Sequence, residues 1–299
     1  MQSDELDHLP MRKQDELAEV ARILFEEFDV AQKSKLKDEQ KKAQILKIIL
    51  FGSYARGGWV EDLKSGYRSD YDLLVVVSNH FATETSEYWD NASERFVREL
   101  TITKHLETPV NFIVHSLHDL NDQLARGRPF FADIARDGIA LYDAPGHPLA
   151  SPKTLSAEET RKEAQRHFEQ WFPGADRFVK LATVAIENEF RNEAAFLLHQ
   201  TVERLYHCVL LVQTLYSPKS HRLSVLRSHA ERVEPRLIDA WPRDTKSARR
   251  CFSRIDRAYV EARYSSQYSI MDEELAWVVK RVTVLQDIVS TVCHERLTG

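Results

Sequence analysis

Apolar residues in the range Met11–Lys42 recur every three or four positions. Leu17, Val20, Leu24 and Phe28 follow this spacing, and the residues between them are mostly polar. The periodicity predicts one long helix with a single apolar face, because positions three and four apart lie on the same side of a helix.

Three shorter runs instead consist almost entirely of apolar, often β-branched residues. Such runs predict buried strands, here over Ile45–Phe51, Tyr71–Val77 and Pro109–Val114. A helix is expected between the second and third runs, over Tyr88–His105. This mixture predicts an α+β domain whose mixed sheet is flanked by helices.

Beyond residue 154 the apolar spacing is helical almost throughout. Pro173-Gly174, Ser217-Pro218 and Trp241-Pro242 interrupt it, and proline and glycine rarely continue a helix. The second half is therefore expected to form an all-α bundle. The predicted helices are Glu158–Phe172, Asp176–Asn188, Arg191–Tyr216, Arg222–Arg232, Ala248–Arg263 and Asp272–Glu295.

The stretch Asp143–Thr154 separates the two patterns, and its three prolines and one glycine are typical of a linker. We expect an N-terminal domain over residues 1–146, a linker over 147–154 and a helical domain over 155–299. The first 150 residues carry 18 basic and 26 acidic side chains, whereas the rest carry 23 and 20. This asymmetry suits two domains that attract one another, or a helical half that meets phosphate.

The chain has no run near the ~18 apolar residues of a membrane span, and its acidic N-terminus lacks the apolar core of a signal peptide. Its three cysteines, Cys208, Cys251 and Cys293, have no metal-binding spacing. We therefore expect a cytoplasmic protein with reduced thiols and no membrane partner.

Candidate chemistry lies at the ends of the first two predicted strands. Gly52 permits a tight turn after the first strand, and Ser53 and the residues after it are expected to open a helix. Helix N-termini suit phosphate, so Gly52, Ser53 and Arg56 are candidate nucleotide-binding residues. Asp70 and Asp72 share one face of the second strand, where their mutual repulsion favours a bound cation such as Mg²⁺. The stretch predicts a Mg²⁺-nucleotide site.

Gly52-Ser53-x-x-Arg56-Gly57 followed by Ser69-Asp70-x-Asp72-Leu73 resembles the signature of the polymerase-beta-type minimal nucleotidyltransferases. The resemblance implies that Asp70 and Asp72 are catalytic and bind two Mg²⁺ ions. It also implies a nucleoside triphosphate substrate, with ATP expected, attack by an acceptor hydroxyl and loss of pyrophosphate. The plainer alternative, a turn and two helix-capping aspartates, requires both halves to match by chance.

Two departures from the family pattern stand out. The loop Gly58–Arg68 is longer than the family leads us to expect. A third carboxylate usually lies on a later strand, and the matching position here is Asn111, with Glu107 and His115 nearby but off register. Asparagine can coordinate a metal through its carbonyl but cannot act as a base, so the third position is expected to be degenerate.

Phe196–Val212 and Ala258–Ile270 resemble the central helix and last characteristic segment of HEPN domains. In HEPN ribonucleases an arginine and a following histidine form a cutting site across a dimer. Arg263 suits the arginine, but Tyr268 stands where the histidine belongs. The motif is therefore expected to be degenerate and metal-independent ribonuclease activity absent, and the nucleotide-binding sacsin-type HEPN domains are closer. A homodimer through the helical domain stays open.

His199, Glu203 and His207 are spaced to share one helical face. Three interpretations of this face are possible: a metal site, a polar groove or a structural hydrogen-bond network. Lys246, Arg250, Arg254 and Arg257 form a basic face that suits solvent, an acidic surface or phosphate.

Two classes of function follow. The first is an enzyme that transfers a nucleoside monophosphate to a hydroxyl of a protein, an RNA or a small molecule. The second is a catalytically impaired nucleotide sensor with a partner-docking helical domain, or a related toxin–antitoxin fusion. The intact Gly52-Ser53 and Asp70-x-Asp72 pairs favour the enzyme, and Asn111 favours the sensor.

Overall fold

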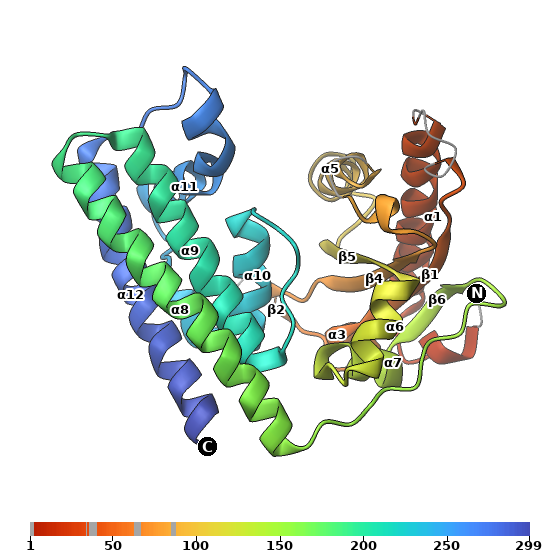
Figure 1. The fold of residues 1–299 in the computed structure, drawn as a ribbon. Helices are drawn as coiled ribbons and strands as arrows, with labels where there is room; N and C mark the ends of the chain where they lie inside the picture. The colour runs from red at the N-terminus through yellow and green to blue at the C-terminus, as the bar shows by residue number, and fades with distance from the viewer. Residues whose placement is uncertain (1–2, 34, 36–40, 63–66, 85–87) are drawn as a thin grey trace. The chain divides into compact units, whose positions relative to one another are not determined.

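The computed structural model describes residues 3–33, 35, 41–62, 67–84 and 88–299. The chain divides into two compact units, Met1–Thr154 and Leu155–Gly299. The first unit combines helices with a sheet, and the second is helical, as the apolar spacing predicts (Figure 1). None of the helices that the structure describes has both the length and the apolar character needed to cross a membrane.

A four-stranded mixed sheet forms the centre of the first unit. Its strands are ordered β5-β4-β1-β6, with β1 antiparallel to β4 and β6, and β4 parallel to β5. The predicted strands are confirmed, and the third begins one residue later and ends two residues later than expected. The edge strand β6 was not predicted. The bounds are β1 Ile45–Phe51, β4 Tyr71–Val77, β5 Val110–Ser116 and β6 Ile139–Asp143.

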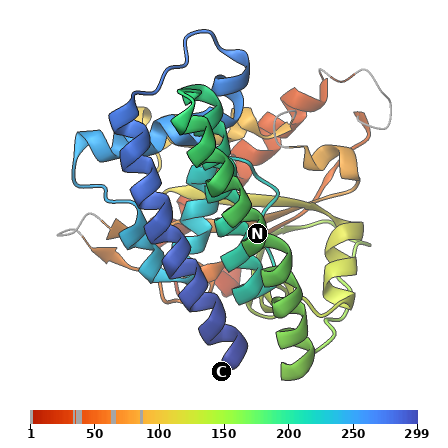
Figure 2. The ribbon, with the colours of Figure 1, turned by 60° about the vertical axis from the view of Figure 1, so that its left-hand side comes forward.

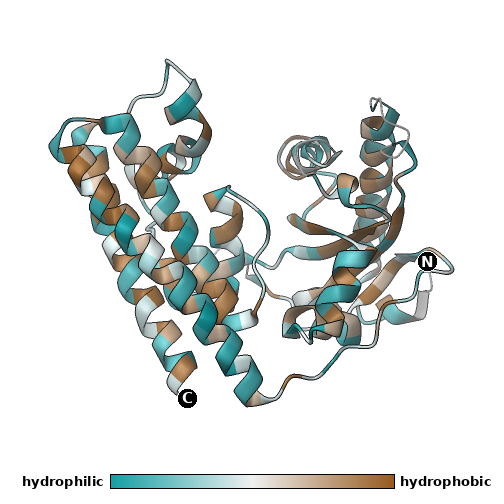
Figure 3. Ribbon diagram, in the orientation of Figure 1, coloured by the Kyte–Doolittle hydropathy of each residue, from teal (hydrophilic) through white to brown (hydrophobic). Residues whose placement is uncertain are grey.

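Helices cover both faces of this sheet (Figure 1). Alternate residues of β1 and β4, including Ile48, Leu50 and Leu73, pack with Leu17 and Val20 of the first helix, and the strands look strongly hydrophobic in Figure 3. The intervening strand residues face α6 and α7, which contact β1, β4 and β5. The helices are α1 Met11–Lys33, α5 Asp90–Arg98, α6 Leu117–Ala125 and α7 Pro129–Asp137.

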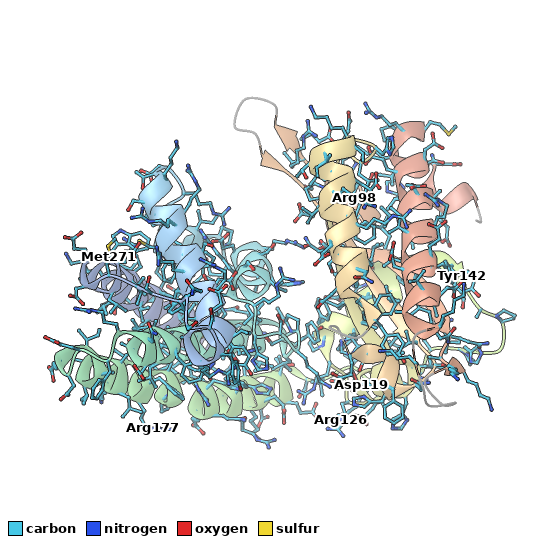
Figure 4. The ribbon with its side chains drawn as sticks, turned by 90° about the horizontal axis from the view of Figure 1, so that it is seen from above. Arg98, Asp119, Arg126, Tyr142, Arg177 and Met271 are labelled. Atoms are coloured by element: carbon cyan, nitrogen blue, oxygen red, sulfur yellow. The ribbon has the colours of Figure 1, made fainter. Side chains whose placement is uncertain are left out.

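Two predicted features of this unit have different bounds in the structure. Helix α1 ends at Lys33 rather than Lys42, and residues 34 and 36–40 lie outside the described part of the chain. The expected helix Tyr88–His105 contains α5 and then widens into a π-helical turn at Glu99–Thr103. Helices α1 and α5 lie side by side in Figures 1 and 4, where Arg98 marks the latter.

Helix α9 is the central element of the second unit. It is buried along much of its length and contacts α8, α10, α11 and α12. Figure 2 shows the long helices α8 and α12 flanking it. The elements are α8 Ala157–Glu187, α9 Arg191–Thr214, α10 Leu223–Val233, the short η4 Pro235–Ala240, α11 Lys246–Tyr264 and α12 Asp272–Thr298.

The prediction of two helices separated by Pro173-Gly174 is wrong, because α8 continues through both residues. Proline removes one backbone donor from a helix, and the long antiparallel contact between α8 and α9 outweighs that loss. Gly174 is buried, and a Cβ there would lie 3.0 Å from a terminal nitrogen of Arg204. The glycine therefore makes room for a side chain of α9 and does not end the helix.

Candidate nucleotide site

The Gly-Ser turn lies directly against the second aspartate. Phe51, the last residue of β1, is paired with Asp72 on β4. Gly52 follows with a φ of +77°, and a Cβ there would lie 2.8 Å from Asp72 Oδ2. Both the backbone angle and this close approach require glycine. The two halves of the sequence motif thus meet in the structure.

Residues Gly52–Ala55 form α3, a helix of a single turn. Its backbone is continued by bonds from Arg56 N to Gly52 O and from Gly58 N to Ser53 O. Arg56 itself is exposed. Hydrogen bonding from Arg136, together with the positive charge of Arg56, lowers the pKa of the Asp137 carboxyl on α7. Arg56 therefore lies within electrostatic reach of α7, and its role as a phosphate contact stays a prediction.

Asp70, Asp72 and Asn111 come together at the same edge of the sheet. Asp72 is buried and pairs with Asn111 in the parallel register of β4 and β5, whereas Asp70 is half-buried. Asn111 Nδ2 donates a hydrogen bond of 2.7 Å to Asp70 Oδ2. Asn111 thus occupies the position expected for the third family carboxylate. Glu107 instead forms an ion pair with Arg12.

This donor set fits a hard divalent cation. Carboxylate oxygens are the ligands that Mg²⁺ prefers, and it completes its coordination with phosphate and water. Within the described ranges, no group of three or more His, Cys, Asp or Glu side chains is arranged to hold a metal. Asp70 and Asp72 therefore suit Mg²⁺ whose remaining coordination positions are filled by a nucleotide and water.

Two buried tyrosines connect the Gly-Ser turn to the strand that carries the aspartates. This contact was not predicted from the sequence. Tyr54 follows Ser53, and Tyr71 lies between the two aspartates. Both are fully buried, and their ring centroids are 4.5 Å apart. Trp59 stacks on Tyr54 at 5.4 Å. Strand alternation places Tyr71 on the face opposite the aspartates, but its partner could not be read from the sequence.

In the helical unit, one face of α9 carries His199, Glu203 and His207, as predicted. Their side chains contact residues of the segment that connects α9 to α10. His199 Nε2 donates to His221 O at 3.0 Å, and His221 Nδ1 lies 3.0 Å from Glu203 Oε1. His207 Nδ1 lies 2.6 Å from Ser217 Oγ. These contacts favour the hydrogen-bond network among the three interpretations of this face.

Acid should destabilise the helical unit through these buried imidazoles. Burial lowers the pKa of both His199 and His207 from 6.5 to about 4. Between these values the unfolded chain binds protons that the folded chain does not. Stability is therefore complete above pH 6.5 and falls by up to ~1.4 kcal/mol per pH unit for each histidine. Urea unfolding at pH 7, 6 and 5 measures this slope, which His207→Gln should reduce and the exposed control His294→Gln should not.

Arg263 and Tyr268, the predicted degenerate HEPN pair, have different surroundings in the structure. Tyr268 is buried, donates a hydrogen bond to the carbonyl of Arg254, and has a pKa raised to about 12 by burial. Arg263 is exposed, donates to the carbonyl of Tyr259 and lies over that ring at 4.3 Å. Their side chains contact different partners.

We therefore expect no RNA cleavage by the purified protein in EDTA, since a buried phenol cannot replace an imidazole as base near pH 7. Fluorescently labelled RNA, resolved on a gel after incubation, tests this. The same assay with Arg263→Ala identifies a contaminating nuclease, because only cleavage lost in that variant would contradict the expectation.

The basic face of α11 is largely neutralised within its own unit. Arg250 and Arg254 both pair with the buried Glu274, at 3.1 and 3.3 Å. Arg257 pairs with Glu261 on the same helix. These contacts favour a structural surface over a phosphate-binding one.

Comparison with known families matches each half of the chain to a separate domain. Residues 32–112 match the nucleotidyltransferase domain, and residues 168–291 match the HEPN domain. No curated protein matches the chain. The first match contains the Gly-Ser turn, both aspartates and Asn111, and the second contains most of the helical unit.

Proposed function

Because the chain joins a nucleotidyltransferase domain to a HEPN domain, we propose that it transfers a nucleoside monophosphate from a Mg²⁺-bound nucleoside triphosphate to an acceptor hydroxyl. The observation that carries the proposal is the close approach of Asp72 to the Gly52 turn, with Asp70 held at the same end of the strand by Asn111. Two carboxylates on one face of a strand can share a bound cation, which offsets their mutual repulsion.

Each element of the site has a task in this reaction. Asp70 and Asp72 would hold Mg²⁺, which when bound offsets the charge of the triphosphate and of the departing pyrophosphate. The backbone at Gly52 and Ser53 would contact the phosphates. Asn111 orients the Asp70 carboxylate through its hydrogen bond. The acceptor oxygen forms a bond to the α-phosphorus as the bond to the bridging oxygen breaks, and the hydroxyl proton passes to solvent.

The nucleotide, the metal ions and the acceptor class of the proposal come from the family resemblance, whereas the cytoplasmic location is proposed from the cysteines and the N-terminus. ATP is the proposed nucleotide, and two Mg²⁺ ions the proposed catalytic complement. The acceptor is a protein, an RNA or a small molecule, and the protein acts in the cytoplasm, with a homodimer formed through the helical unit.

A second candidate function is favoured by Asn111 alone. Its amide donates to Asp70 where the family usually has a third carboxylate. A site with two acids can bind a Mg²⁺-nucleotide and still activate an acceptor hydroxyl poorly. The chain would then be a nucleotide sensor whose helical unit docks a partner, as in a toxin–antitoxin pair.

Incubation with each α-³²P-labelled nucleoside triphosphate and Mg²⁺ tests the proposal, with the protein itself, total RNA, cell protein and small-molecule hydroxyl compounds as acceptors. Transfer should label an acceptor and release pyrophosphate, and EDTA should prevent both. Nucleotide binding without transfer to any acceptor would favour the sensor. Absence of both binding and transfer would contradict both candidates.

A further inference from the structure

Two opposite charges are buried on the face of α1 that packs against the sheet. Lys13 and Glu16, one helical turn apart, are each only 5% exposed. Their neighbours Leu17 and Val20 on that face are apolar and fully buried. Burying a charge is costly unless it is well paired, and apolar substitutes are often equally stable or more so. Packing alone therefore does not account for these two side chains.

Lys13 connects α1 to the segment that leads into β5. Its Nζ donates to Thr108 Oγ1 at 2.7 Å and pairs with Glu61 at 2.5 Å. Thr108 is fully buried and stands three residues before Asn111. Lys13 thus fixes the start of the strand that carries Asn111.

Glu16 connects α1 to the start of β4. Its Oε2 accepts a hydrogen bond of 3.2 Å from the hydroxyl of Tyr71, and its Oε1 accepts a longer one from Glu107 N. Tyr71 lies between Asp70 and Asp72 and packs on Tyr54, which follows the Gly-Ser turn. Glu16 thus contacts the aspartate strand directly, through Tyr71, and the Gly-Ser turn indirectly, through the packing of Tyr71 on Tyr54.

We propose that Lys13 and Glu16 are positioning residues that hold Asp70, Asp72 and Asn111 in the arrangement needed for a Mg²⁺-nucleotide. This inference rests on the proposed function for the identity of the ligand. Neither residue is placed in contact with substrate. They act through Thr108 and Tyr71, from the face of the sheet opposite the aspartates.

The double variant Lys13→Met/Glu16→Leu removes both buried charges of α1 at once. Glu61 loses its ion pair with Lys13, but its side chain is 30% exposed and can be solvated. Glu16→Gln is the conservative variant, since its amide oxygen can still accept the Tyr71 hydrogen bond. Arg22→Met is the matched control, as Arg22 lies on the same helix in exposed ion pairs with Glu19 and Glu26.

Hydrogen exchange of the ligand-free protein is the first measurement, and it needs no activity. The double variant should raise exchange ~10-fold or more at the amides near Asp70 and Asn111, while Val77 and the melting temperature change little. The second measurement is the Mg²⁺ concentration at half-maximal ATP binding. It should rise ~10-fold, the lower end of the loss seen when partners of metal ligands are removed. Glu16→Gln and Arg22→Met should resemble wild type in both.

Unchanged exchange near Asp70 and Asn111 in the double variant would overturn the inference, as would uniform loosening of the whole unit. If exchange changes as expected but wild type binds no Mg²⁺-bound nucleoside triphosphate, the proposed function fails, while the role of Lys13 and Glu16 in fixing these three residues stands. If wild type binds Mg²⁺-ATP and the double variant binds it equally well, the positioning role fails and the proposed function stands.

Discussion

Replacing Asp70 and Asp72 together with asparagine should abolish Mg²⁺-dependent nucleotide binding and leave the fold intact. The two carboxylates supply the negative charge that a divalent cation needs, and asparagine keeps their shape without it. Affinity for Mg²⁺-ATP should fall by at least ~100-fold, because losing even the partner of a metal ligand can cost that much. Isothermal titration calorimetry with ATP and Mg²⁺ measures the change.

The melting temperature of this double variant should stay the same or rise slightly. Asp72 is buried beside a second acid, so losing its charge relieves repulsion in the ligand-free protein. Asp122→Asn/Asp133→Asn is the matched control, since both residues lie in exposed ion pairs on α6 and α7. Wild-type affinity in the Asp70/Asp72 variant would show that nucleotide binds elsewhere.

Strands β1 and β4 could be predicted well because each is a short apolar run that is buried on both faces, and β5 was recognised although most of its residues are only half-buried. The edge strand β6 escaped prediction, since Ala140 and Tyr142 are exposed and the run is only five residues long. At Pro173 the sequence instead predicted a break that the structure does not have, because α8 continues through this residue. A local breaking signal was outweighed by helix packing, which sequence spacing does not show.

The arrangement of the site residues could be predicted where it depends on neighbours in sequence. Gly52 and Ser53 follow one strand, Asp70 and Asp72 begin the next, and strand alternation puts the acids on one face. The supporting contacts depend on residues far apart in the chain. Glu16 meets Tyr71 across 55 positions, and Lys13 meets Thr108 across 95. No local pattern distinguishes these buried charges from the solvated ones of the same helix.

Substituting Asn111 with aspartate supplies the third carboxylate that the family pattern leads us to expect. The Asn111 amide donates to Asp70 Oδ2, so a carboxylate at this position would face Asp70 at hydrogen-bond distance. In the absence of metal, Asn111→Asp should raise the pKa of one of the two acids and lower the melting temperature, because like charges this close disfavour ionisation. Added Mg²⁺ should restore more stability to this variant than to wild type.

With Mg²⁺ and nucleotide bound, Asn111→Asp should speed transfer to the acceptor. The added carboxylate can accept the hydroxyl proton, a contribution typically worth ~10²–10⁴ in rate. Single-turnover measurements at saturating ATP report this step apart from binding. Asn111→Leu is the control, because it also removes the hydrogen bond to Asp70 but adds no acid, so it should not speed transfer. Fast transfer by wild type that Asn111→Asp leaves unchanged would mean that the position beside Asp70 needs no third acid. Equal acceleration by both variants would mean that the Asn111 hydrogen bond restrains Asp70, and that releasing it, not adding a base, sets the rate.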